Sequence, residues 1–420
     1  MVWTALGPRY AHGKVGLVVD SDNNNLLSCY RYYSLSSIEI RFFACRIGIG
    51  DDKRITGCLY SGPTSDCDDN HMNYVFILVV SFSISWIVSK LIVKYGRLLK
   101  ILDNPATHKH PKVVHTEIIP RGGGIPVFAS LVITLLAFGK TDIQALGIIA
   151  GAGILATVGF IDDRFEEKFS PYARLLLNGL AALCIVAVGI GISYITNPLG
   201  GILYFDPLIA KILAILWLVW MQNIVGWSSG VDGQLPGFVI IAAGVMAILG
   251  LRFGQDLTLA LITVGAYAGF LPWNWFPQKM LPGYGGKSLA GFLLGTLAIL
   301  SSAKVGALIM VLGLPMLDAV RVIIKRISER RSPVWGGWDH LHHYLLSRGW
   351  GKRRIAVFYW TASAILAYLA LNLNSGAKYF TMATVTCVFF GIFAWWNYWS
   401  ISQKPRVRGN GSKTSPSMRP

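Results

Sequence analysis

Long apolar runs dominate this 420-residue chain, and they constrain its fold more than any other feature. The composition is 53% hydrophobic and only 14% charged, whereas an average soluble chain carries about 25% charged residues. A helix needs about 20 apolar residues to cross the hydrocarbon core of a bilayer. The pattern therefore predicts an all-α fold, a polytopic transmembrane helical bundle.

About eleven such runs can be placed along the chain. They cover approximately residues 73–93, 122–138, 143–161, 174–192, 208–225, 235–251, 257–273, 288–303, 305–324, 355–372 and 379–400. Lys and Arg residues collect mainly in the segments that follow the first, third, seventh and ninth runs. Because positive loops are retained in the cytoplasm, we expect the N-terminus outside, the C-terminus inside and every motif-bearing loop on the cytoplasmic side.

The segment before these runs has a different composition. Residues 1–71 hold four of the six cysteines and have no apolar run long enough for a signal-peptide core. Two interpretations remain open: a mis-assigned upstream start, with translation beginning at Met72, or a poorly ordered extracytoplasmic extension with disulfides. We expect residues 72–402 to form one transmembrane domain and residues 403–420 to form a disordered basic tail.

The net charge of +17 would be typical of a nucleic-acid-binding protein if the chain were soluble. Here the positive charge lies in loops that would face anionic lipid headgroups. We therefore expect the lipid bilayer, and no nucleic acid, as a partner. A basic cytoplasmic face also suits substrates that carry phosphate.

Two adjacent carboxylates, Asp162 and Asp163, follow the apolar run 148–161. Carboxylates at a membrane boundary are costly to desolvate unless a cation or solvent compensates them. Hard cations such as Mg²⁺ prefer carboxylate oxygens and bridge to substrate phosphates. A Mg²⁺ site and a solvated helix end are both compatible with the pair.

A histidine cluster in the long basic loop forms a second candidate site. His340, His342 and His343 cannot share one helical face, which makes a three-ligand zinc site from this segment awkward. Imidazoles can instead contact phosphate or base edges or transfer protons, and a polar turn is the structural alternative. Asp318, inside an apolar run, marks either a functional group or an ion pair with Arg321 one turn away.

These motifs occur in a familiar order. The segments "HPKVVHTEIIPRGGG", "GFIDD", "QNIVGWSSGVDG", "PMLDAVRVIIKR" and "DHLHHYLL" resemble those of the polyprenyl-phosphate N-acetylhexosamine-1-phosphate transferases, glycosyltransferase family 4. This family includes the phospho-N-acetylmuramoyl-pentapeptide transferases and the undecaprenyl-phosphate N-acetylglucosamine-1-phosphate transferases, and "IPRGGG" looks closer to the latter. The resemblance covers the chain from about Met72 to the last apolar run.

The resemblance implies a reaction and a location. A sugar 1-phosphate would pass from a UDP-sugar to a polyprenyl phosphate with release of UMP, at the cytoplasmic face of a bacterial-type plasma membrane, for cell-wall or surface-glycan lipid intermediates. Mg²⁺ would be the cofactor, held by Asp162 and Asp163, which with Asp232 would be the catalytic residues. A homodimer is an open possibility. The implied substrate-binding residues are Lys112, His115, Arg121, Asn223, Lys287, His340, His342 and His343.

The chain departs from the family pattern at several polar positions. Gly226 and Ser229 replace the second Asn and the first Asp of one family segment, and Tyr284 or Gly285 stands where the usual metal-binding Asp belongs. Lys287 either contacts the diphosphate and takes over part of the Mg²⁺ role, or marks a catalytically impaired paralogue that still binds UDP-sugar or polyprenyl phosphate. A lipid or solute transporter is the third hypothesis. The loops contain no sequence pattern that specifies the sugar, the lipid length or the pathway.

Overall fold

The computed structural model describes residues 14–19, 27–32, 45–47, 66–105, 117–165, 169–197, 201–301, 305–335 and 337–402. It divides into two compact units, Met1–His71 and Met72–Pro420. In the first unit, β1 (Lys14–Val19), β2 (Leu27–Tyr32) and β3 (Cys45–Ile47) form an antiparallel sheet in that order. The two interpretations of residues 1–71 remain predictions, and the expected tail at 403–420 lies outside the described residues.

The rest of the described chain is mostly helical. Its helices are α1 (Asp66–Tyr95), α2 (Gly124–Phe138), α3 (Ile143–Phe165), α4 (Pro171–Ala187), α5 (Pro207–Trp227), α6 (Gln234–Arg252), α7 (Thr258–Asn274), α8 (Gly283–Leu300), α9 (Val305–Val311), α10 (Gly313–Ser328), α11 (Leu341–Ser347), α12 (Lys352–Asn372) and α13 (Ser375–Ser402). Two short antiparallel pairs lie in the loops: β4 (Leu102–Asp103) with β5 (Ile119–Pro120), and β6 (Tyr194–Thr196) with β7 (Ile202–Tyr204).

Each predicted apolar run coincides with a helix, except that the ninth is divided into α9 and α10, which meet at an angle of 82°. In the part of the chain that the structure describes, six helices are long and apolar enough to cross a membrane, or seven if the bent pair counts as one span. Helices α2 and α4 are apolar but shorter. A helical multi-pass membrane protein is thus confirmed, whereas eleven spans and their orientation remain predictions.

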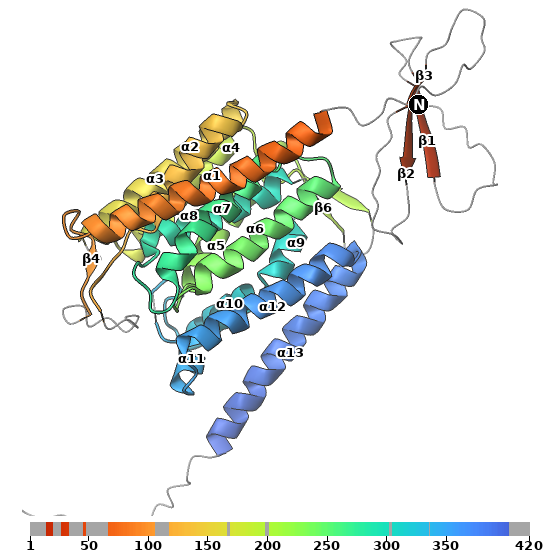
Figure 1. Ribbon diagram of the computed structural model, residues 1–420. Coiled ribbons are helices and arrows are strands. Elements are labelled where there is room, and N and C mark those ends of the chain that lie inside the picture. Colours follow the sequence, from red (N-terminus) through yellow and green to blue (C-terminus); the bar gives the residue numbers. More distant parts are fainter. Residues whose placement is uncertain are drawn as a thin grey trace, which may run out of the picture. The chain divides into compact units, whose positions relative to one another are not determined.

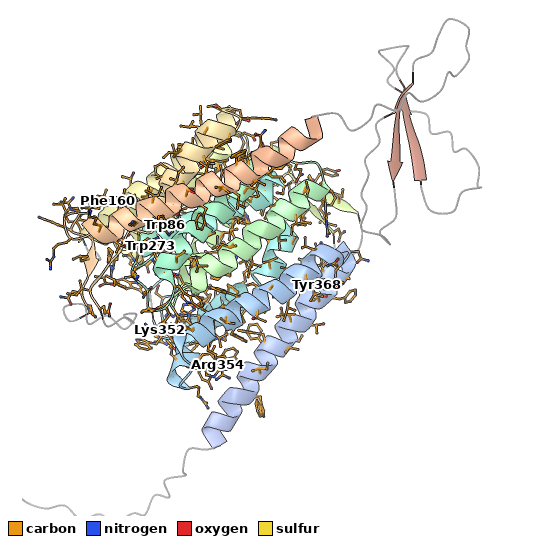
Figure 2. All side chains as sticks on the ribbon, viewed as in Figure 1. Trp86, Phe160, Trp273, Lys352, Arg354 and Tyr368 are labelled. Atoms are coloured by element: carbon orange, nitrogen blue, oxygen red, sulfur yellow. The ribbon has the colours of Figure 1, made fainter. Side chains whose placement is uncertain are left out.

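Helix α8 is the buried centre of the bundle. It packs against α5, α3 and α2, and nearly all of its side chains are buried. Small residues allow this close packing: a Cβ on Gly291 would lie 2.4 Å from the Cα of Gln222 on α5. The outer helices expose large apolar side chains, such as Phe76 on α1 and Leu176 on α4, as expected for surfaces that face lipid. Trp86 of α1 packs against Trp273 of α7 with ring centroids 5.9 Å apart (Figure 2).

The connections between helices bring the polar motifs together at one end of the bundle. The ends of α3, α5, α7 and α10 and the starts of α4, α6 and α8 all contribute to one cavity. Figure 1 shows β4, the end of α3, the start of α12 and α11 at this end.

Candidate active site

One polar cavity collects most of the predicted site residues. It is lined by Arg121, Asp162, Asp163, Asn223, Lys287, His340, His342 and His343. Residues that are far apart in the sequence therefore meet at the same end of the bundle. The predicted contacts Lys112 and His115 lie outside the described residues.

The two adjacent aspartates occupy the last turn of α3 and have different partners. Asp162 Oδ1 accepts hydrogen bonds from Nε and Nη2 of Arg174, at 3.2 and 2.9 Å. Asp163 Oδ1 accepts a hydrogen bond from the backbone N–H of Tyr284 at 3.1 Å, and its buried Oδ2 has no hydrogen-bond partner among the described residues. Both carboxylates are buried. A guanidinium therefore compensates one aspartate, whereas a backbone amide holds the other.

The turn that begins α8 depends on a glycine. Gly283 has a φ of +64°, and a Cβ there would lie 2.0 Å from Asp163 Oδ2. A side chain would thus be strained by the backbone conformation and would collide with the carboxylate. This glycine brings the N–H of Tyr284 onto Asp163.

Tyr284 is one of the two residues, with Gly285, that stand where the family resemblance places a metal-binding acid. Its O–H donates to Asn178 Oδ1 at 2.6 Å, and the Arg174 guanidinium carbon lies 5.5 Å from its ring centroid. Among the described residues no group of three or more His, Cys, Asp or Glu side chains could hold a metal ion. Arg174 meets Asp162 through Oδ1 alone, so Asp163 Oδ2 and the second oxygen of Asp162 are the carboxylate donors of the pair. With a guanidinium against one aspartate and, in the described part of the chain, no third acid beside them, the donor set differs from the one that the resemblance implies for Mg²⁺.

The cavity wall carries charged side chains of both signs. Four cationic side chains line it, Arg121, Arg174, Lys287 and Arg326, together with three carboxylates, Asp103, Asp162 and Asp163. Arg121 Nη2 pairs with Asp103 Oδ2 at 2.7 Å. Arg326 Nη2 pairs with Asp339 Oδ2, outside the lining, at 3.1 Å. Counted with Asp339, the cations and carboxylates of the wall are equal in number, and guanidinium and ammonium groups can bind an anionic ligand such as a diphosphate.

The three histidine rings lie close together because His342 and His343 belong to a helix and His340 precedes it in an extended conformation. His340 precedes α11 with an extended backbone (φ −72°, ψ 152°), whereas His342 and His343 lie in its first turn. The rings of His340 and His342 are stacked with centroids 5.6 Å apart, and those of His342 and His343 are 4.2 Å apart. Burial, reinforced by the charges of His343, His340 and Lys287, holds the pKa of His342 well below its ordinary value. His342 is therefore a neutral hydrogen-bonding group near pH 7.

Asp318 positions the first of these histidines. His340 Nδ1 donates to Asp318 Oδ2 at 2.9 Å, and Asp318 Oδ1 accepts from the backbone N–H of Leu341 at 2.9 Å. Arg321 Nη2 pairs with the same oxygen at 2.8 Å. The predicted ion pair exists, and the same carboxylate fixes the orientation of the His340 ring. With Nδ1 engaged, Nε2 is the ring atom of His340 that can meet a ligand.

Comparisons with known proteins agree with this arrangement. Residues 145–302, which include the aspartates, the segment around Asn223 and Lys287, match the family model described as "Glycosyl transferase family 4". A probable undecaprenyl-phosphate N-acetylglucosaminyl 1-phosphate transferase of Bacillus subtilis is 26% identical over 324 residues, covering 75% of this chain and 89% of the relative.

Two further relatives represent two branches. A decaprenyl-phosphate N-acetylglucosaminephosphotransferase of Mycolicibacterium smegmatis is 23% identical over 70% of this chain and 79% of its own length. A phospho-N-acetylmuramoyl-pentapeptide-transferase of Bacillus licheniformis is 28% identical over 71% of this chain and 97% of its own length. The chain therefore resembles glycosyl transferase family 4 over residues 145–302, and it resembles these relatives at 23–28% identity over 70–75% of its length. By class it is a sugar-phosphate transferase enzyme.

The segment between α5 and α6 departs from the family pattern that the sequence resembles. Ser229, in place of the usual Asp, donates from Oγ to the carbonyl oxygen of Gly226 at 2.7 Å. A Cβ on Gly230 would lie 1.9 Å from His342 Nε2. The segment therefore closes on itself and packs directly against the histidine cluster, whereas Asn223 donates from Nδ2 to Val219 O at 2.7 Å.

Asp232, predicted to be catalytic, is not itself among the residues that line the cavity, although its neighbours Val231 and Gln278 are. Its buried carboxylate is 3.4 Å from Lys352 Nζ and accepts a hydrogen bond from the backbone N–H of Gln278 at 3.3 Å. Lys352 is the first residue of α12 (Figure 2). In this geometry Asp232 joins three segments at the cavity end of the bundle, and its catalytic role stays a prediction.

Sequence reasoning missed Arg174 and Asn178. Both lie on α4, whose start is marked by the N-cap Ser170 and by Pro171. An arginine at the edge of an apolar run is itself a signal for a functional or paired group. However, the partner of Arg174 lies on the preceding helix, and no local pattern identifies it.

Proposed function

We propose that this cavity transfers a sugar 1-phosphate of the N-acetylhexosamine type from a UDP-sugar to a polyprenyl phosphate, at the cytoplasmic face of a bacterial-type plasma membrane. The observation that carries the proposal is the meeting of the aspartate pair and the three histidines in one cavity that four cationic side chains also line. The relatives are named as transferases that act with polyprenyl phosphate or as a phospho-N-acetylmuramoyl-pentapeptide-transferase. The product would serve a cell-wall or surface-glycan pathway.

The reaction balances without a further reactant. An oxygen of the lipid phosphate attacks the β-phosphorus of the UDP-sugar, and a new P–O bond forms. The bond between that phosphorus and the bridging oxygen breaks, so UMP leaves with the electron pair. Positioning and charge stabilisation supply most of the rate enhancement in phosphoryl transfer.

Different residues of the cavity would serve different parts of this reaction. Asp163 Oδ2, which has no hydrogen-bond partner among the described residues, can accept a proton from, or orient, the attacking lipid phosphate. His340 and His342 can donate to or accept from the nucleotide, with His340 held by Asp318. Arg174 and Lys287 line the cavity and can bind diphosphate oxygens.

The lipid tail requires an apolar surface beside the polar cavity. A groove between α10, α11, α12 and α13 exposes only apolar surface and is lined by residues including Leu314, Leu341, Leu345 and Phe389. Helix α11 thus contributes histidines to the cavity and leucines to the groove. A lipid phosphate could keep its tail in apolar surroundings while its headgroup reaches the cavity.

The test measures UMP release by the purified full-length chain with UDP-N-acetylglucosamine and undecaprenyl phosphate. We expect Asp163→Asn to lower the rate by about 10²- to 10⁴-fold. The control is Asp206→Asn, an exposed N-cap of α5, where Asn caps about as well as Asp. Equal rates for Asp163→Asn and the control would overturn the role of Asp163.

The second candidate is a catalytically impaired paralogue that only binds its ligands. The replacements at Gly226, Ser229 and Tyr284 favour it, because each removes a polar group that the family pattern has. Ligand binding without UMP release across a panel of UDP-sugars would identify it. Transport is not proposed, because the cavity lies at one end of the bundle, whereas transporter sites usually lie at mid-membrane.

A further inference from the structure

We infer that the guanidinium of Arg174 and the ammonium of Lys287 neutralise the substrate diphosphate in place of a divalent ion, so that this chain binds a UDP-sugar without a divalent cation. The inference rests on the proposed function, because it names the groups that hold the diphosphate of that substrate. It concerns the place at which the donor set disagrees with a resident Mg²⁺ ion.

Arg174 is fixed beside the aspartate pair and still faces the cavity. Its hydrogen bonds to Asp162 Oδ1 use Nε and Nη2, two of the five N–H donors of a guanidinium. Its side chain remains 29% exposed, against 6% for that of Asp162. The group is thus oriented by the protein and keeps donors for a ligand. A planar guanidinium can bind phosphate oxygens through two parallel hydrogen bonds.

Tyr284 holds Arg174 in this position. Its ring lies 5.5 Å from the guanidinium carbon, and its O–H donates to the backbone carbonyl of Arg174 at 3.2 Å and to Asn178 Oδ1 at 2.6 Å. The residue that replaces the expected metal-binding acid therefore supports a cation. A carboxylate at this position would instead add negative charge for a metal ion.

Lys287 places a second cation one helical turn beyond Tyr284. It lines the same cavity and interacts electrostatically with both Asp163 and His342. It therefore shares the cavity with the aspartates and the histidine cluster, where a diphosphate would lie if the nucleotide contacted the histidines.

The cations of the wall support the same conclusion. Four cationic side chains line the cavity, and one of them, Arg326, is paired with Asp339 outside the lining. A divalent ion would add two further positive charges near Arg174 and Lys287, in surroundings that screen charge poorly.

The experiment measures the binding of UDP to the full-length chain by isothermal titration calorimetry, in excess EDTA and in Mg²⁺. We expect dissociation constants that agree within about threefold in the two buffers. Arg174→Gln and Lys287→Gln should each weaken binding in EDTA by about tenfold or more, because each removes a charge-assisted hydrogen bond. The matched controls Arg164→Gln and Lys279→Gln, exposed cations outside the cavity lining, should leave it unchanged.

The remaining outcomes are distinguishable. Binding that requires Mg²⁺ would overturn the inference and leave the proposed function in place, whereas UDP that fails to bind in either buffer would overturn both. Arg174→Lys keeps the charge but loses the planar fork, so it should bind UDP with intermediate affinity if Arg174→Gln fails to fold. Affinity of Arg174→Lys and Lys287→Gln equal to the wild type in EDTA would also overturn the inference.

Discussion

Replacing Asp318 by Asn tests whether this buried carboxylate positions His340 for the nucleotide. The side chain is 1% exposed and accepts hydrogen bonds from His340 Nδ1, Leu341 N and Arg321 Nη2. An Asn amide has the same shape but only one acceptor oxygen, and its NH₂ group faces a donor at the other position. The His340 ring must then change tautomer or turn.

The contacts set the expected magnitude. A hydrogen bond that involves a charged group contributes about 1.5–3 kcal/mol, and breaking a buried ion pair costs about 3–5 kcal/mol. The change loses one or two of the three bonds and the pair with Arg321, so we expect a loss of about 3 kcal/mol in stability. A misplaced His340 that loses one hydrogen bond to the nucleotide should weaken UDP binding about tenfold, equivalent to about 1.4 kcal/mol.

The assay combines thermal unfolding in detergent with UDP titration, and Arg321→Gln is the comparison variant. That change breaks the ion pair but leaves the bond between Asp318 and His340 Nδ1. Both variants should unfold at lower temperature, and only Asp318→Asn should lose UDP affinity. Unchanged affinity for Asp318→Asn, or an equal loss for both variants, would refute the positioning role.

Three further predictions follow from the same end of the bundle. Gly230→Ala should weaken UDP binding at least tenfold, because its Cβ would lie 1.9 Å from His342 Nε2. The control Gly179→Ala should leave UDP binding unchanged, because a Cβ there meets nothing within 4 Å. Equal UDP affinities of the two variants in titrations would contradict the prediction. Asp232→Asn should lower the unfolding temperature and leave UDP affinity within about threefold of wild type, because Asp232 is paired with Lys352 outside the cavity lining. A much larger loss of UDP affinity would assign Asp232 to the nucleotide-binding site. Burial, with nearby charges, lowers the pKa of His342 well below 6.5. Its contribution to stability is therefore complete above about pH 6.5 and falls as the pH drops, because the unfolded chain then binds a proton that the folded chain excludes. His342→Gln should flatten the acid side of the curve of unfolding temperature against pH, and an unchanged slope would argue against this.

The helices could be predicted from the sequence because membrane spans are encoded locally. Each predicted run coincides with a helix or with the bent pair α9 and α10. The bend falls at Leu312, between the two helices, and apolarity alone does not report it. The number of crossings depends on the bilayer as well as on the chain, so helix length and apolarity do not decide it.

Many of the residues that line the cavity could also be predicted from the sequence, but their hydrogen-bond and ion-pair partners could not. The histidine spacing excluded one shared helical face, and His340 indeed lies outside α11. Arg174 could not be paired with Asp162 from the sequence, because the two lie 12 residues apart on different helices. Asp232 matches a family position, yet its pairing with Lys352 arises only from the packing of α12 against the loop before α6.

The most direct measurement follows the β-phosphorus of the sugar nucleotide. The full-length chain, in nanodiscs with undecaprenyl phosphate, is supplied with UDP-N-acetylglucosamine labelled with ³²P at the β-phosphate, and lipid and aqueous products are separated. The proposed reaction predicts that the label enters the lipid phase while unlabelled UMP accumulates in equal amount. Label that stays with the nucleotide or appears as free sugar phosphate, here and with other labelled UDP-sugars, would contradict transfer of a sugar 1-phosphate to the lipid.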